Sequence, residues 1–158
     1  MRQTRVHPRI LGYLGRALSL ELSAVQQYMT QASLVEAWGL PEAAARLREE
    51  TVEEMRHAEL ITQRMLSLGA APNASQLRPA GVGRTLVDLL RQDTILEGEI
   101  IAIYQDALTF CQRVGDADNG AFFQRLLQEE LAHAHDIEHW LASLGVPRRG
   151  HDSDRIYF

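Results

Sequence analysis

Apolar residues recur with helical spacing along most of this 158-residue chain, and proline and glycine interrupt the pattern at only a few points. In an amphipathic α-helix, apolar positions return every three or four residues because one turn takes 3.6 residues. The periodicity predicts helices over residues 7–38, 41–68 and 85–114, and a fourth from the break at 115–118 to residue 144. Each predicted helix ends immediately before a glycine, a common helix-stop signal.

The connections between these helices differ in length. Short turns join the first helix to the second and the third to the fourth, so each pair should form an antiparallel hairpin. Residues 70–83 lack periodicity and hold two prolines and two glycines. Fully extended, such a segment reaches ~45 Å at about 3.3 Å per residue, enough to cross the length of a bundle. The pattern therefore predicts an all-α protein with one domain over residues 1–158: a ferritin-like four-helix bundle over residues 7–144, with a long crossover between helices two and three, and a polar tail over residues 146–158.

Composition and charge argue against some kinds of binding partner for this chain. Apolar residues make up 46% of the chain, enough for one buried core, and the net charge is −5. Basic residues are interspersed with acidic ones, which argues against a nucleic-acid partner because such proteins gather basic residues on one face. No apolar run approaches the ~20 residues of a membrane span, and no apolar signal segment follows the basic start. The single cysteine, Cys111, excludes an internal disulfide and suits a reducing compartment, so we expect a cytoplasmic protein with no membrane partner.

One arrangement of glutamate and histidine occurs twice in the chain. In each copy, a lone glutamate is followed thirty-three residues later by the motif Glu-x-x-His. The six residues are Glu21, Glu54 and His57 in the first copy and Glu97, Glu130 and His133 in the second. The two halves of the chain thus look like copies of one helical hairpin, which would face each other across a pseudo-twofold axis.

The four glutamates of the two copies lie in the middle of apolar stripes. Successive residues of a helix are rotated by about 100° around its axis. Glu54, for example, then falls on the same side of its helix as Leu47, Ala58, Ile61 and Met65. A helical glutamate is usually solvated, and an unpaired buried carboxylate is costly. Each histidine lies on nearly the same face as its glutamate, so both can converge on a metal ion that neutralises the buried charge. The pattern favours a dinuclear metal site over a coincidental set of satisfied core polar residues.

Four further residues lie close to the predicted site in the helical pattern. A ligating histidine usually needs a hydrogen-bond acceptor on its second ring nitrogen. Glu53, Glu129 and Asp93 are candidates for this role, although Glu53 and Glu129 could equally be solvated. Tyr28, two turns after the first lone glutamate, is either a redox-active phenol close to the metals or a core aromatic residue, and its spacing favours the core.

The donor atoms indicate the metal. Carboxylate-rich ligation with one imidazole per metal suits iron or manganese better than a metal selected by thiolates, and iron is favoured. Two adjacent Fe(II) ions can together reduce O2 or H2O2 by two electrons. From the residues alone, the sequence predicts oxygen-dependent di-iron chemistry.

Several segments resemble a known family. Residues 21–28 (ELSAVQQY), 38–40 (WGL) and 54–59 (EMRHAE), followed by Leu68-Gly69 and Pro72-Asn73, are similar to bacterioferritin, and the resemblance covers roughly residues 8–144. It implies an iron-storage protein with two iron ions per subunit at a ferroxidase centre, which oxidises Fe(II) to Fe(III) with O2 or H2O2. The ferric product would be mineralised inside a hollow protein shell. The ligands that the resemblance implies are Glu21, Glu54, His57, Glu97, Glu130 and His133, with Glu54 and Glu130 bridging.

The resemblance also implies a second cofactor, a haem, and Met55 is the residue expected to bind it. It follows Glu54 and points about 100° away from the core line, onto the flank of the bundle. In bacterioferritins the matching methionine and its symmetry mate ligate one b-type haem across a twofold dimer. We therefore expect Met55 to bind haem at a subunit interface; an exposed or interface methionine without haem is the alternative.

The end of the chain departs from the family pattern. Bacterioferritins carry a short fifth helix near the fourfold axes of a 24-subunit shell, whereas residues 146–158 contain Pro147, Gly150 and five charged residues. We expect the fifth helix to be absent or reduced. A 24-subunit homo-oligomer built from twofold dimers is still favoured, with an altered shell or a mixture with a second subunit type as alternatives. A ferredoxin-type protein is a candidate reductant for the stored iron.

Related functions remain as alternatives. A DNA-protecting mini-ferritin forms a 12-subunit shell, but its metal site is usually shared between subunits, whereas all six candidate ligands here lie in one chain. A rubrerythrin-like peroxidase would share the di-iron residues, but this chain lacks the cysteine pairs of a rubredoxin-type electron-transfer module. A substrate-oxidising di-iron oxygenase is least supported, because a bundle of 158 residues has little room for a substrate pocket.

Overall fold

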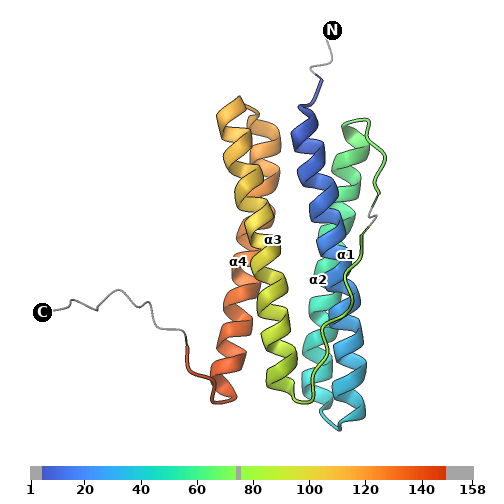
Figure 1. Ribbon diagram of the computed structural model, residues 1–158, viewed down its shortest axis with the longest axis vertical. Helices are drawn as coiled ribbons and strands as arrows, with labels where there is room; N and C mark the ends of the chain where they lie inside the picture. Colours follow the sequence, from blue (N-terminus) through green and yellow to red (C-terminus); the bar gives the residue numbers. More distant parts are fainter. Residues whose placement is uncertain (1–4, 74–75, 149–158) are drawn as a thin grey trace, which may run out of the picture.

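Four long helices build the described part of the chain. The computed structural model describes residues 5–73 and 76–148. The helices are α1 (Pro8–Ala37), α2 (Pro41–Ser67), α3 (Leu86–Val114) and α4 (Ala117–Ser143), and they run side by side along one long axis (Figure 1). α1 packs on α2, α3 packs on α4, and α1 contacts α3, which joins the two hairpins into one bundle. The expected all-α four-helix bundle is confirmed, and the helix bounds lie within one residue of the predicted ones, except at the start of α4.

Asp116 accounts for the earlier start of α4. The predicted break extends to residue 118, whereas the helix already begins at Ala117. Asp116 Oδ1 accepts a hydrogen bond from the Asn119 backbone N–H at 3.0 Å, and Asp116 Oδ2 accepts one from the Asn119 side chain at 2.8 Å. An aspartate cap satisfies a backbone donor of the first turn and starts the helix directly after itself. Gly115 makes the preceding turn possible, because it adopts a left-handed φ of 73°.

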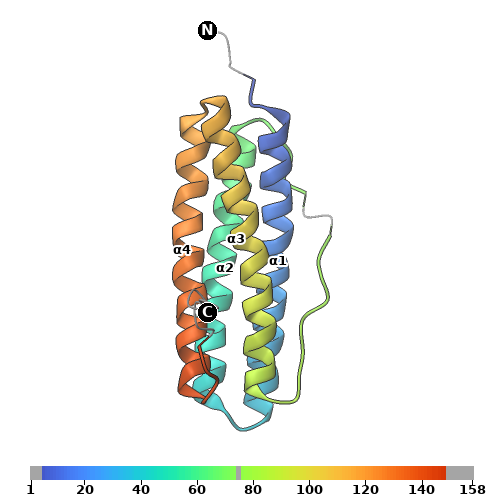
Figure 2. The ribbon, with the colours of Figure 1, turned by 60° about the vertical axis from the view of Figure 1, so that its left-hand side comes forward.

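The described parts of the connection between α2 and α3, residues 68–73 and 76–85, lie along the bundle beside α1, as both ribbon views show (Figures 1 and 2). Three hydrogen bonds to α1 hold them there, one of which the Gln31 side chain donates to the Gly81 carbonyl at 3.1 Å. The Ser23 hydroxyl accepts one from the backbone N–H of Arg78 at 3.0 Å, and Gln27 Oε1 accepts one from the backbone N–H of Gly81 at 2.9 Å. A Cβ at Gly81 would lie 2.9 Å from Gln92 Cβ, so this close approach requires glycine. The long crossover is thus confirmed.

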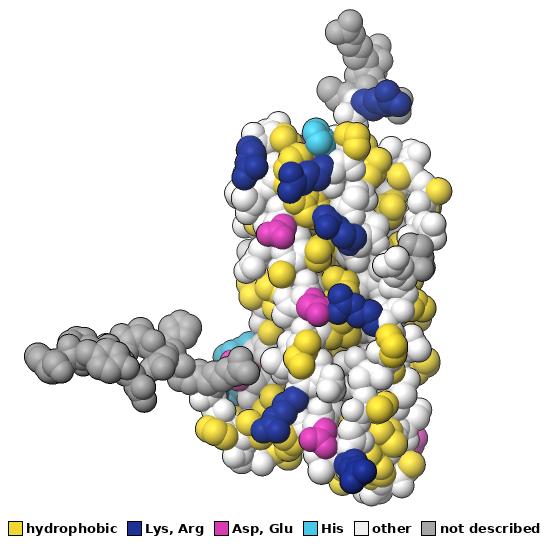
Figure 3. All heavy atoms as spheres, in the orientation of Figure 1, with side chains coloured by type: hydrophobic (Ala, Val, Ile, Leu, Met, Phe, Trp, Pro, Cys, Tyr) yellow, Lys and Arg dark blue, Asp and Glu magenta, His cyan; other side chains and the backbone are white. Residues whose placement is uncertain are grey.

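The apolar core lies between the four helices and surrounds the polar residues discussed below. Every helix contributes side chains that are fully buried, among them Leu14, Leu47, Leu90 and Phe123. On the face drawn in Figure 3, basic and acidic side chains are scattered among apolar ones.

The segment after α4 is described only in part. Residues 146–148 are not helical, and the rest of the predicted polar tail, 149–158, lies outside the described residues. Among the helices that the structure describes, none is long and apolar enough to cross a membrane.

Candidate metal centre

All six candidate ligands lie on the faces that the helices turn toward one another. The lone glutamates come from α1 and α3, and the Glu-x-x-His motifs come from α2 and α4. Because residues three apart share a helix face, each motif presents its glutamate and its histidine to the same space. The side chain of His133 is 13% exposed. The fully buried members are Glu21, Glu54, His57, Glu97 and Glu130.

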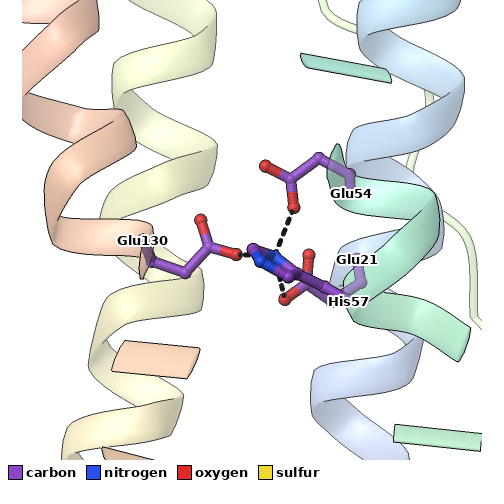
Figure 4. Close-up of side chains that lie close together, drawn as sticks. All are labelled: Glu21, Glu54, His57 and Glu130. Atoms are coloured by element: carbon purple, nitrogen blue, oxygen red, sulfur yellow. Dashed lines mark hydrogen bonds and ion pairs between the residues drawn. The ribbon is translucent and has the colours of Figure 1, made fainter. Parts of the chain in front are cut away.

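The six side chains form two overlapping groups of four. Within each group, one possible ligand atom from every residue lies within 4.8 Å of the others. Figure 4 shows one group, in which Glu130 reaches across from the opposite hairpin toward His57. Glu54 and Glu130 belong to both groups. The first group is Glu21, Glu54, His57 and Glu130, and the second is Glu54, Glu97, Glu130 and His133.

Each shared carboxylate presents one oxygen to each histidine. His57 Nδ1 lies 2.7 Å from Glu130 Oε1 and 3.2 Å from Glu54 Oε2. His133 Nδ1 lies 2.9 Å from Glu54 Oε1 and 3.6 Å from Glu130 Oε2. Both histidines therefore turn the same ring nitrogen toward the centre, and Glu54 and Glu130 span the distance between them.

The shared carboxylates and the histidines stabilise one another as ions. Burial disfavours the charged form of His133, but hydrogen bonds to Glu130 and Glu54 outweigh this effect and raise its pKa to about 10. The pKa of His57 is raised above the usual range in the same way. Burial alone would raise the pKa values of Glu54 and Glu130, but hydrogen bonds, including those to the histidines, lower both. Before metal binds, two imidazolium ions therefore balance two carboxylates.

The environment of Glu21 and Glu97 favours their neutral, protonated form. Burial, followed by the charge of Glu54, raises the pKa of each well above its usual range. Oε2 of each residue is buried and accepts no hydrogen bond from the described part of the chain, and the same holds for Glu130 Oε2. These oxygens and the imidazole nitrogens fit divalent cations that prefer oxygen and nitrogen ligands, iron and manganese among them.

Each histidine turns its second ring nitrogen to an acid outside the two groups. His57 Nε2 lies 2.7 Å from Glu129 Oε2, and Arg56 donates to the same oxygen. His133 Nε2 lies 3.2 Å from Glu50 Oε2. Partners of this kind orient an imidazole ligand and set which nitrogen faces a metal.

Three residues were predicted to accept a hydrogen bond from the second ring nitrogen of a histidine, and one of them contacts a histidine in the described structure. Glu129 does so, whereas Glu53 is exposed, which is the alternative that the sequence left open for it. Asp93 accepts its hydrogen bond from a glutamine of α1 at 2.7 Å, so its prediction is wrong. Glu50 takes the role instead. Glu50 lies one helical turn before Glu54, and residues four apart share a helix face. This spacing in the sequence could have identified Glu50 as a residue close to the centre.

Sequence reasoning also missed Tyr104. Its hydroxyl donates a hydrogen bond to Glu21, while the Tyr28 hydroxyl donates one to Glu97 Oε1 at 2.7 Å. Tyr28 is buried, as predicted for a core residue, but it also contacts the centre. Tyr104 follows Tyr28 by 76 residues, the separation between the two copies of each candidate ligand, and this repeat could have identified it.

Met55 and Cys111 lie away from the six grouped residues. Met55 is 54% exposed on α2, as its helical position predicts, and Val52 on the same flank is 64% exposed. Cys111 is fully buried, and burial raises the pKa of its thiol to about 11. The cysteine is therefore a buried apolar residue rather than a reactive thiol.

Known proteins are similar in sequence to this chain over most of its length. A ferritin-like domain is recognised over residues 11–145. The bacterioferritin of Rhodobacter capsulatus is 35% identical to the chain, over 82% of this chain and 81% of that protein. The bacterioferritin of Mycobacterium leprae is 33% identical, over 87% of each chain.

The fold is also similar to a solved structure, that of Rhodobacter capsulatus bacterioferritin. The TM-score is 0.86 at 32% sequence identity, and the match covers 90% of this chain and 89% of that chain. That protein is described with a metal-free dinuclear site and a haem iron in a crystallographic special position. The resemblance noted in the sequence is therefore confirmed by family, by relatives and by fold, and the chain belongs to the bacterioferritin family of ferritin-like iron-storage proteins.

Proposed function

We propose that this chain stores iron by oxidising Fe(II) to Fe(III) at a di-iron ferroxidase centre and by holding the ferric product inside a shell of like subunits. The observation that carries the proposal is the position of Glu54 and Glu130, each of which presents one oxygen to each histidine. This arrangement supports two adjacent ions joined by two carboxylates, with Glu21 and Glu97 as terminal ligands.

The protein groups have separate tasks in this reaction. Four carboxylates balance the charge of two divalent ions, so iron can enter a buried site without leaving an uncompensated charge. The outer acids Glu129 and Glu50 hold the imidazole rings so that Nδ1 faces the ions. Two Fe(II) ions each give one electron to O2, which takes up two protons and leaves as H2O2. With H2O2 as the oxidant, two electrons and two protons yield two water molecules.

The test is aerobic loading with many Fe(II) equivalents per subunit, followed by size-exclusion chromatography with light scattering and absorbance detection. We expect ferric absorbance to co-elute with a closed particle of about 24 subunits, because closed symmetry is what encloses a mineral. A 12-subunit particle would indicate the mini-ferritin alternative. A dimer that retains about two ions per chain and precipitates the rest would contradict storage and indicate a redox enzyme of the rubrerythrin type.

Haem is the second part of the proposal, with Met55 as its ligand. The thioether of Met55 belongs to a side chain that is 54% exposed on the flank of α2, so a group between two subunits can reach it. The haem iron of the Rhodobacter capsulatus protein lies in a crystallographic special position. A twofold pair of Met55 side chains would supply two equal ligands to one haem between two copies of this chain.

Met55→Leu is expected to remove the Soret absorbance of protein purified from haem-supplied cells. Leucine keeps the apolar volume but has no sulfur to bind iron. Met29→Leu is the matched control, because Met29 is also 54% exposed, and it should retain the Soret band. The first turnover of Fe(II) oxidation should be unchanged in both variants, since neither residue belongs to the two ligand groups. Wild-type protein without a Soret band would contradict the haem proposal.

A further inference from the structure

The two outer acids of the centre differ in what holds them. Glu129 Oε2, which faces His57 Nε2 at 2.7 Å, also accepts a hydrogen bond from the guanidinium of Arg56. Glu50 faces His133 Nε2 at 3.2 Å and forms no ion pair with an arginine among the described residues. Only one of the two histidines therefore contacts an acid that a charge-assisted hydrogen bond fixes from behind.

The sequence explains this difference. Each ligand of the first copy recurs 76 residues later, but the residues that support the histidines do not. The counterpart of Arg56 is Ala132, which has no side-chain donor, and the counterpart of Glu50 is Leu126. The metal ligands thus follow a twofold repeat, whereas the groups behind them do not.

Arg56 also binds the counterpart of Glu129 in the repeat. That counterpart is Glu53, whose Oε2 lies 3.3 Å from the Arg56 guanidinium. Glu53 pairs with Arg56 rather than with His133. Because two carboxylates face this one guanidinium, little net positive charge is left to oppose a metal ion at the centre.

The two histidines differ in exposure as well. The side chain of His57 is 0% exposed and that of His133 is 13% exposed. The Arg56 and Glu129 side chains are 39% and 31% exposed, and an ion pair this exposed adds little to the stability of a fold. A role for the pair is therefore to be sought at the imidazole that it contacts.

We propose that Arg56 is a positioning residue that makes the two metal positions unequal, so that the ion beside His57 is held more tightly than the ion beside His133. The inference rests on the proposed di-iron function and deepens it. Arg56 fixes Glu129, and Glu129 fixes the His57 ring with Nδ1 toward the ion before metal arrives. Glu50 lacks such a tie, so the His133 ring must be ordered when its ion binds.

Zinc(II) chloride is a probe that needs no turnover, because Zn(II) binds imidazole and carboxylate ligands and has no redox chemistry. The full-length protein is loaded with less than one equivalent per chain, so that few chains hold two ions. Anomalous scattering from crystals then gives the occupancy of each position. The ratio of the two occupancies compares the positions directly, because repulsion between two bound ions does not enter it.

Arg56→Ala is the main variant, since the second copy already has alanine at this position. Arg56→Lys is the conservative variant, which keeps a cationic donor. Arg125→Ala is the matched control. Arg125 also lies beside Glu129, but its Nε is 3.6 Å from Oε1, the oxygen that does not face His57, and its side chain is 65% exposed.

We expect the wild type to favour the His57 position by at least about tenfold, because losing an outer partner of a metal ligand costs about 10–100-fold in affinity. In Arg56→Ala, the two occupancies should become nearly equal. Arg56→Lys should restore most of the preference, and Arg125→Ala should keep the wild-type ratio within about twofold.

A merely structural role for Arg56 gives a different result. It predicts a lower melting temperature for Arg56→Ala together with an unchanged occupancy ratio, and that outcome would overturn the proposal. Equal occupancies in the wild type would overturn it too, and both results leave the di-iron function intact. Failure of the wild type to bind two Zn(II) ions per chain at excess metal would instead defeat the proposed function.

Discussion

Replacing Glu54 with alanine is expected to slow the initial oxidation of Fe(II) by more than about 100-fold, because losing even an outer partner of a metal ligand costs about 10–100-fold. Glu54 belongs to both ligand groups, so its removal affects both ions at once. His133→Ala should act in the same direction, because it removes the imidazole of one group. The measurement is stopped-flow absorbance of the ferric product, after anaerobic protein with two Fe(II) equivalents per chain is mixed with O2.

Glu49→Ala is the matched control for these two variants. Glu49 is an exposed glutamate of the same helix, and its loss should leave the rate within about twofold of the wild type. All three variants should keep most of their helical circular dichroism, because each changes one side chain and leaves the apolar core between the four helices unchanged. Wild-type oxidation rates in both Glu54→Ala and His133→Ala would defeat the ligand assignment.

The pH dependence of metal binding is the second large expected effect. The pKa values of Glu21, Glu97 and both histidines are raised, which favours the protonated form of these four groups before metal binds. A divalent ion must displace those protons, so the affinity falls as the pH falls below the raised pKa values. Each displaced proton changes the binding constant about tenfold per pH unit. The product of the constants for two ions should therefore fall by up to about 10⁴ between pH 7 and pH 6.

Calorimetric titration with Zn(II) in buffers of different ionisation enthalpy counts the displaced protons. We expect about four protons per two ions bound near pH 7. Glu21→Gln provides the internal check, because glutamine has no proton to lose and the count should fall by about one. A release of fewer than about two protons from the wild type would contradict the protonation states assigned to the centre.

The fold was largely predictable because helical periodicity is a local property of the chain. Apolar stripes and glycine stops placed the four helices and both hairpins, and the length of residues 70–83 indicated the crossover. The start of α4 escaped this reasoning, since it depends on a side-chain cap by Asp116 that apolar periodicity does not register. The burial of Glu54 and Glu130 was also predictable, because both lie within apolar stripes of their helices, as the buried leucines do.

By itself, the sequence determined which side chains face the interior, because the direction of a side chain on a helix depends on its rotation of about 100° per residue. Only the tertiary structure decided which atoms meet. It pairs His133 with Glu50 rather than Glu53. It also brings Arg56 onto Glu129 of the other hairpin and sets the crossed hydrogen bonds of the two tyrosines. These contacts join different helices, so they depend on how far apart the hairpins lie and how each is rotated, and both follow from the packing of the whole core.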